Sequence, residues 1–155
     1  MSILIFSDTH GNTSDAIRII NEASVVDAII HAGDHIADAD KIHNIFPYIP
    51  MYSVSGNCDF LGMQIPSLSF MLKDKKFFLT HGHHFGVKTD LSSLKKHCVE
   101  NDIDIAIFGH THSPLIDYCG STTIINPGTM HGYKKSYAVV EIENGKIIAD
   151  IKQGM

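Results

Sequence analysis

The sequence predicts one α/β domain over residues 1–155, with two mixed β-sheets flanked by helices. Three observations predict it. Apolar runs of strand length alternate with helical periodicity in the first half of the chain, and short strands with hairpin signals fill most of the second half. The length of 155 residues fits one domain, and no linker, repeat or low-complexity segment divides it. The composition, 44% hydrophobic and 19% charged, is that of an ordinary globular protein.

The first half of the chain alternates strands with helices. Each expected strand is a short apolar run, and each expected helix has apolar residues three or four positions apart. The expected strands are 3–6, 27–32 and 51–54. The expected helices are 13–24 and about 38–46. This alternation favours a parallel sheet with right-handed crossovers.

The second half is richer in strands. A hairpin is expected from two apolar runs around a turn at Lys73–Lys76, and a helix is expected over about 88–101. The last two strands flank Asn144-Gly145, a strong signal for a type I′ turn. The expected strands are 68–72, 77–80, 103–108, 115–118, 122–125, 137–142 and 146–151.

Net charge, cysteine usage and the length of the apolar runs argue against several classes of protein. The net charge of −5 and the lack of a long basic cluster argue against a nucleic-acid partner. Three scattered cysteines without a CxxC motif argue against a disulfide framework and against a thiolate zinc site. No apolar run approaches the ~20 residues of a membrane span, and no secretory leader is visible. We therefore expect a cytoplasmic protein.

Five loops carry one pattern, in which an apolar strand ends, a small residue turns the chain and a side chain able to bind metal follows. The carboxyl ends of strands in an α/β sheet converge on one crevice, so these side chains are expected to meet. The chain has eleven histidines, and four of them belong to this set. The set is Asp8, His10, Asp34, Asn57, His81, His110 and His112.

Each loop taken alone has an ordinary structural explanation. Asp8 could cap the following helix, Gly-Asp and Gly-Asn are common turns, and a single buried His81 is more often hydrogen-bonded than metal-bound. The pair His110 and His112 is more specific, because residues i and i+2 of an extended segment share a face. The five loops together favour a metal site.

The residue types indicate the metals and the reaction. Imidazoles with carboxylate and amide oxygens suit Mn, Fe, Co, Ni or Zn better than Mg or Ca. Two divalent ions ~3.5–4 Å apart need a bridging anion, for which Asp34 is the candidate. With Asp8 and Asp34 as the carboxylates among the candidates, the site stays cationic and attracts a phosphate ester. A hydroxide bridging the two ions would then attack phosphorus in line.

At these residues the chain resembles the calcineurin-like metallophosphoesterase superfamily, and within it the small prokaryotic, YfcE-like phosphodiesterase branch. The matching segments are Asp8-Thr9-His10, Gly33-Asp34, Gly56-Asn57-Cys58-Asp59, Thr80-His81-Gly82-His83 and Gly109-His110-Thr111-His112, and Asn126-Pro127-Gly128-Thr129 is also similar. The resemblance implies a four-layer αββα sandwich of two mixed sheets flanked by helices. It also implies a dinuclear metal-dependent phosphodiesterase.

The resemblance assigns roles to individual positions. One ion would be held by Asp8, His10, Asp34 and His112, and the other by Asp34, Asn57, His81 and His110. Catalytic roles would fall to Asp34, Asn57, Asp59 and His83, and substrate contacts to Asn57, Cys58 and His83.

Cys58 departs from the pattern of many larger family members, which have histidine at this position. A neutral thiol is a poor acid for an alkoxide leaving group, so we expect diesters to be preferred over monoesters. The alternative is that Cys58 simply packs beneath the site. His35, His84 and His131 could line the crevice, whereas His31 is expected in the core and His43 and His97 on helix surfaces.

Two rival functions remain. One is a phosphomonoesterase or nucleotide hydrolase of the same superfamily. The other is a non-catalytic, protein-binding scaffold of the same fold, which the complete set of candidate ligands disfavours. The expected partner is a small phosphate-ester substrate, with no membrane and no nucleic acid, and a homo-oligomer is left open.

Overall fold

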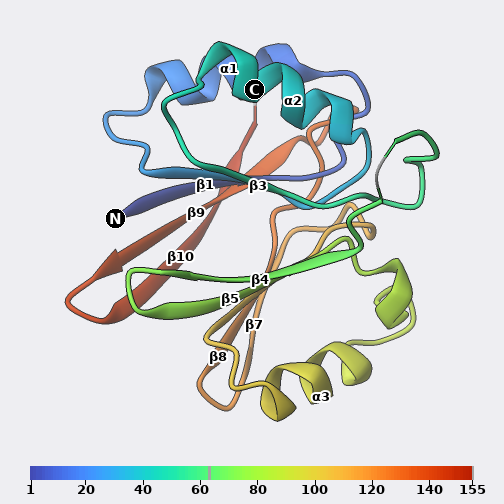
Figure 1. Cartoon of the computed structure of the whole chain (residues 1–155), viewed down its shortest axis with the longest axis vertical. Coiled ribbons are helices and arrows are strands. Elements are labelled where there is room, and N and C mark those ends of the chain that lie inside the picture. The colour runs from blue at the N-terminus through green and yellow to red at the C-terminus, as the bar shows by residue number, and fades with distance from the viewer. Residues whose placement is uncertain (63, 155) are drawn as a thin grey trace.

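The computed structural model describes residues 1–62 and 64–154 and shows four layers (Figure 1). Two helices cover one face of a first sheet, a second sheet packs against its other face, and a third helix covers the outer face of the second sheet. The predicted αββα arrangement of two mixed sheets is confirmed.

The first sheet has the strand order β10-β9-β1-β2-β3. Its centre is parallel, because each helix crosses over and returns the chain in the same direction, while β9 and β10 run antiparallel to it. The elements are β1 (Ser2–Phe6), α1 (Thr13–Glu22), β2 (Ala28–His31), α2 (Ile36–Ile45), β3 (Met51–Ser53), β9 (Ser136–Glu143) and β10 (Lys146–Gln153).

The second sheet has the order β4-β5-β6-β8-β7. Strands β5, β6 and β8 are parallel, and β4 and β7 pair antiparallel at the two edges. The elements are β4 (Ser67–Leu72), β5 (Lys75–Thr80), a 3₁₀ turn (His83–Phe85), α3 (Ser92–Glu100), β6 (Ile105–Ile107), β7 (Leu115–Cys119) and β8 (Thr122–Asn126).

Alternation along the strands builds the core. In β1, Ile3 and Ile5 face the second sheet, whereas Leu4 and Phe6 face α1 and α2. Phe77 of β5 belongs to the layer between the sheets. All five side chains are at most 3% exposed, and full burial of an apolar side chain of this size stabilises a fold by roughly 1.5–3 kcal/mol. The sheets are therefore a rigid support for the loops at their edge.

Two features of the second sheet differ from the sequence prediction. The turn between β4 and β5 is only Lys73-Asp74, both with positive φ, so Lys75 and Lys76 belong to β5. Helix α3 begins at Ser92 rather than near residue 88, because residues 86–89 form a separate turn in which the N–H of Thr89 donates to the carbonyl of Gly86 at 2.9 Å. By contrast, the turn at Asn144 and its following glycine has two positive φ angles, as expected for type I′.

The two sheets are joined at the edge where their parallel strands end. After β5, the His81 ring nitrogen Nδ1 lies 2.7 Å from the carbonyl of Ala32, which follows β2. After β8, the N–H of Met130 donates to the carbonyl of Ser7, which follows β1, at 3.2 Å. This edge brings the five candidate loops together. Among the described residues, no helix is both long and apolar enough to span a membrane.

Candidate metal centre

Four of the candidate ligands form one compact cluster at this edge. Asp8, His10, Asp34 and His112 each offer one ligand atom, and these atoms all lie within 4.8 Å of one another. His112 Nε2 is 3.1 Å from Asp8 Oδ1, and His10 Nε2 is 3.7 Å from Asp34 Oδ2. The cluster therefore joins loops that follow three different strands.

The two oxygens of Asp8 have different surroundings. Oδ2 accepts the Ser7 hydroxyl at 2.5 Å and the backbone N–H of His110 at 3.2 Å, whereas Oδ1 is buried with no hydrogen-bond partner. His10 Nε2 is also buried without a partner. Leaving such atoms unsatisfied costs about 1–3 kcal/mol each, so this pair of orphaned atoms fits a cation. Burial is also the main reason that the pKa of Asp8 is raised.

A second set of candidate ligands lies on the other side of Asp34. His81 Nε2 is 3.1 Å from Asn57 Oδ1 and 3.4 Å from Asp34 Oδ1. A carbonyl can only accept, so the contact with Ala32 places a proton on His81 Nδ1. In the neutral imidazole, Nε2 then presents a lone pair to two oxygens. Three lone-pair atoms converge here, which is the arrangement that a cation stabilises.

His110 joins this group through its ring, whose centroid is 5.0 Å from that of His81. Burial, helped by His81 and Lys88, lowers the pKa of His110 to about 4. Burial likewise lowers the pKa of His10. Imidazoles that stay neutral at physiological pH keep a lone pair for a metal.

Asp34 lies between the two groups, with Oδ1 toward His81 and Oδ2 toward His10. Its Oδ1 also accepts the backbone N–H of Cys58 at 3.0 Å. Burial opposes ionisation of Asp34, but hydrogen bonding from Cys58 favours it, and the pKa of Asp34 lies below its ordinary value. Asp34 is therefore an anion with one oxygen toward each group.

The backbone at these positions is unusual. Five candidate ligands adopt the left-handed region, which is uncommon for residues other than glycine and costs ~1–3 kcal/mol at each position. They are Asp8 (φ 51°), His10 (45°), Asp34 (57°), His110 (67°) and His112 (57°).

Two glycines allow close approach to the carboxylates. A Cβ on Gly109 would meet the Ser7 hydroxyl and lie 2.8 Å from Asp8 Oδ2, and a Cβ on Gly56 would overlap the Asp34 carboxylate and backbone. Both glycines belong to the sequence motifs, and their role here is steric.

The motif at residues 126–129 supports the loops. Asn126 Nδ2 donates to the carbonyl of Gly109 at 3.0 Å and to the Thr111 hydroxyl at 2.9 Å. The Thr129 hydroxyl donates to the carbonyl of Asp8 at 2.8 Å. These bonds fix the segments that carry Asp8 and the two histidines around Thr111.

A buried polar network that sequence analysis missed lies beneath His10. The Thr9 hydroxyl donates to Asp38 Oδ2 at 2.8 Å and is 3.0 Å from His31 Nε2, and the N–H of Gly11 donates to the same Asp38 oxygen at 2.7 Å. His31 and Asp38 are at most 1% exposed. The prediction that His31 lies in the core is confirmed. Asp38 fixes the loop around His10, and in the sequence it looks like any acidic residue on a helix.

The loop after Asn57 excludes one alternative for Cys58 and shows what Asp59 contacts. Cys58 is exposed, so it does not pack beneath the site. The family resemblance implied a catalytic role for Asp59; in the structure its Oδ1 accepts the N–H of Ile36 at 2.9 Å and its Oδ2 accepts the N–H of Gly56 at 2.8 Å. With both oxygens engaged by the backbone, Asp59 positions the loop.

The remaining histidines fall into two sets. His35 and His131 flank His10, with ring centroids 4.9 and 5.4 Å away, and His84 lies 4.0 Å from His83. His83 itself is 5.4 Å from the ring of His81, its Nδ1 is buried without a partner, and burial lowers its pKa. The other set lies on helices. His43 is exposed, whereas His97 packs partly buried against Phe78 and Phe85.

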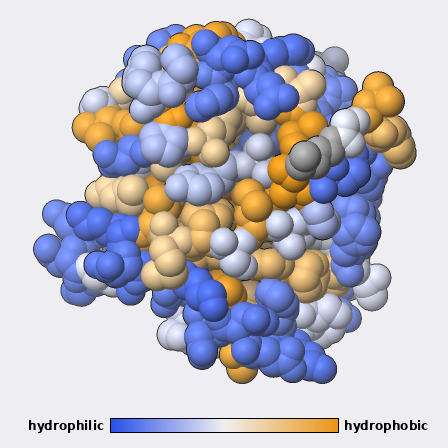
Figure 2. All heavy atoms as spheres, in the orientation of Figure 1, coloured by the Kyte–Doolittle hydropathy of each residue, from blue (hydrophilic) through white to orange (hydrophobic). Residues whose placement is uncertain are grey.

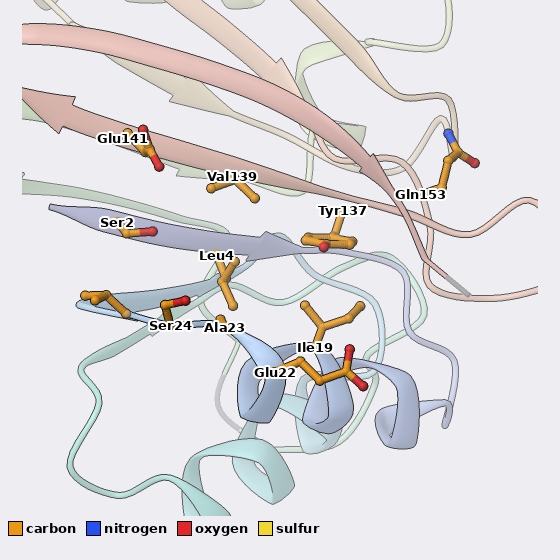
Figure 3. Close-up of a pocket in the computed structure, with 11 residues that line it drawn as sticks. Ser2, Leu4, Ile19, Glu22, Ala23, Ser24, Tyr137, Val139, Glu141 and Gln153 are labelled. Carbon is orange, nitrogen blue, oxygen red and sulfur yellow. The ribbon is translucent and has the colours of Figure 1, made fainter.

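A cavity of about 460 Å³ lies elsewhere, between α1 and the outer face of the first sheet (Figure 3). Ile19 of α1, Leu4 of β1 and Tyr137 and Val139 of β9 surround it. None of the seven candidate ligands lines it. This cavity is therefore separate from the cluster of candidate ligands at the strand ends.

The fold and the cluster define an α/β protein with a candidate metal centre of aspartate and histidine. Residues 1–145 match the calcineurin-like phosphoesterase superfamily domain, so the chain belongs to this superfamily, whose members use divalent metals. The family predicted from the motifs is confirmed. Membership supports a hydrolase.

Named relatives extend over most of the chain. Probable metallophosphoesterase YsnB of Bacillus subtilis is 31% identical over 150 residues, which cover 93% of this chain and 86% of YsnB. Phosphodiesterase YfcE of Escherichia coli K12 is 26% identical, over 96% of this chain and 92% of YfcE. A crystal structure of a predicted phosphoesterase from Streptococcus pneumoniae superposes with a TM-score of 0.83 at 27% identity, over 98% of this chain and 88% of that one.

The same fold occurs in Vps29. The structure of Vps29 from Entamoeba histolytica complexed with Zn²⁺ superposes with a TM-score of 0.77 at 18% identity, and each chain is fully covered. At this identity the similarity concerns the fold alone.

Proposed function

We propose that this protein is a dinuclear metal-dependent phosphodiesterase. The observation that carries the proposal is the position of Asp34, which presents one carboxylate oxygen to His81 and the other to His10. A carboxylate placed in this way can bridge two cations, and two-metal sites need such a bridge.

In this proposal Asp8, His10, Asp34 and His112 hold one ion, and Asp34, Asn57, His81 and His110 hold the other. The mixture of imidazole, carboxylate and amide donors suits Mn, Ni, Fe, Co or Zn. When bound, such ions lower the pKa of water and polarise phosphoryl oxygens. The residues themselves fix the donors, through the contacts of Asp8 with Ser7 and of His81 with Ala32.

The charge of the site favours a phosphate ester. Asp8 and Asp34 bring two negative charges, so two divalent ions leave the site positive although the chain carries −5. His83 lies beside His81, and its buried, unpartnered Nδ1 can hydrogen-bond a phosphate oxygen. The proposed partner is thus a small phosphate ester.

A preference for diesters is supported by Cys58. This thiol lies beside Asn57, with Sγ 3.7 Å from Asn57 Nδ2, at the position where a leaving-group acid would be expected. Burial and the nearby Asp34 raise the pKa of Cys58, so the thiol holds its proton and is a weak acid for an alkoxide. The phosphodiesterase name of YfcE supports the same preference.

Metal binding and turnover test the proposal together. Chelator-treated protein should bind two Mn²⁺ ions per chain by calorimetry and should then hydrolyse bis-p-nitrophenyl phosphate faster than p-nitrophenyl phosphate. Asp34→Asn should weaken both sites and lower kcat/KM at least ~100-fold, because it removes the shared charge. Asp40→Asn, on the exposed face of α2, is the matched control. One ion per chain would refute the dinuclear centre, and faster monoester cleavage would refute the diester assignment.

A further inference from the structure

A second, apolar cavity borders the candidate metal centre. It has a volume of about 240 Å³ and lies between the first turn of α2 and the loop from β3 to β4. We call it the side cavity. Figure 2 shows hydrophobic atoms projecting at the upper right, where Figure 1 places this loop. Its lining residues are Ile36, Ala37, Cys58, Asp59, Phe60 and Leu61.

Both walls of the side cavity begin at candidate ligands. Ile36 lies two residues after Asp34, and Cys58 directly follows Asn57. The Cys58 N–H also donates to Asp34 Oδ1 at 3.0 Å. Consecutive Cα atoms are about 3.8 Å apart, so the backbone of the cavity edge lies within about 8 Å of these ligands. A group attached to a phosphate at the metal centre can therefore reach it.

Asp59 holds the loop in this position. Its carboxylate accepts N–H groups from Ile36 on one wall and from Gly56 at the base of the loop, and its own N–H donates to the Gly56 carbonyl at 3.2 Å. The two walls are thereby tied together.

The side chains that line the side cavity are mostly apolar. The side chains of Phe60 and Leu61 are 85% and 90% exposed, an unusual state for large apolar residues next to a charged site. The only carboxylate of the lining, that of Asp59, is already hydrogen-bonded through both oxygens. The lining can thus recognise a ring by contact and aromatic stacking, without reading its hydrogen-bonding edge.

We propose that the side cavity binds the apolar, ring-bearing ester group of a phosphodiester whose phosphate lies at the metal centre. This inference rests on the proposed function and adds its substrate class: phosphate esters of aromatic or nucleoside groups, without selection among ring types. Elsewhere the centre is bordered by polar side chains, including the imidazoles of His35 and His131, so the side cavity is where an apolar substituent gains most from burial.

Phosphonates test the side cavity without turnover. Calorimetry of Mn²⁺-loaded protein compares methylphosphonate with benzylphosphonate, which share the phosphate-like group and differ in the ring. We expect benzylphosphonate to bind roughly ten-fold more tightly, the low end of what hydrophobic pockets discriminate. Phe60→Ser and Leu61→Ser should each reduce the ratio of the two Kd values, and together bring it near one. Tyr118→Ser removes an aromatic ring that is 65% exposed on β7 and should keep the ratio.

The outcomes separate the two proposals. Equal Kd values in the wild type, or a ring preference that survives the double substitution, would overturn the side-cavity proposal and leave the metal centre intact. Failure of both phosphonates to bind would refute the phosphate site itself. A second copy of the chain is the other possible occupant of this surface, and analytical sedimentation of the same variants tests for it. If the protein is a dimer that dissociates on Leu61→Ser while the Kd ratio is unchanged, the surface is a subunit contact and the subsite is overturned.

Discussion

Gly56→Ala adds one methyl group beneath the carboxylate that is proposed to bridge the two ions. The backbone of Gly56 is outside the positive-φ region, so alanine is strained there only by contact. The new Cβ would lie 2.8 Å from Asp34 Cγ and would overlap Asp34 Oδ1 and the backbone nitrogen, whereas ordinary contact begins near 3.4 Å. The carboxylate must therefore move by roughly an ångström, and displacement of this size can lower a rate about 100-fold.

We expect Gly56→Ala to lower kcat/KM about 100-fold, to weaken Mn²⁺ binding and to destabilise the fold by about 1–3 kcal/mol through overpacking. Calorimetry, diester turnover and urea denaturation measure the three effects. Gly120→Ala is the control, because Gly120 lies in the β7–β8 turn with φ 58° and open space around its Cβ. It should lower stability by about 1 kcal/mol without affecting metal binding. Unchanged Mn²⁺ affinity and turnover in Gly56→Ala would refute the placement of Asp34.

Two further predictions concern Cys58 and His31. Cys58→His should raise monoester turnover relative to diester turnover, since imidazolium can protonate an alkoxide; an unchanged ratio would remove the argument from the thiol. Burial lowers the pKa of His31 to about 4, so between pH 6.5 and 4 the unfolded chain binds the additional proton. This group's contribution to stability is full above pH 6.5 and falls by roughly 3 kcal/mol toward pH 4. In urea titrations of chelator-treated protein, His31→Gln should flatten this pH slope while the exposed control His43→Gln keeps it; equal slopes in all three proteins would contradict the assignment.

The layers could be predicted from the sequence because a strand that is buried on both faces appears as a continuous apolar run. In β1 every residue from Ile3 to Phe6 is buried, alternately against the other sheet and against the helices, so the strand reads as an unbroken apolar run. Helix α1 shows its buried stripe at Ala16, Ile19 and Ile20 in the same way. Boundaries at polar turns were harder, since Lys75 and Lys76 look like turn residues until their pairing with β4 is known.

The candidate ligands and the supporting motif at residues 126–129 could also be found in the sequence, whereas the positioning contacts of Asp38 and Asp59 could not. A ligand must follow a strand end and carry a metal-binding atom, and both properties are visible in one chain segment. Asp38 and Asp59 act through backbone N–H groups that are 27 and 23 residues away in sequence. No local pattern marks such distant partners, so these positioning contacts went unnoticed in the sequence.

The orienting groups explain how the strained loops persist. Asp8 and His10 both have positive φ on either side of Thr9, a conformation that a free loop would leave. The Thr9 hydroxyl donates a hydrogen bond to Asp38, and the Thr129 hydroxyl donates one to the carbonyl of Asp8. The loop is thereby fixed while Asp8 Oδ1 and His10 Nε2 remain buried without a hydrogen bond. A cation bound between these two atoms would satisfy both of them, which the hydrogen bonds of the protein do not. The proposed metal centre would therefore account for the strain and for the orphaned atoms together.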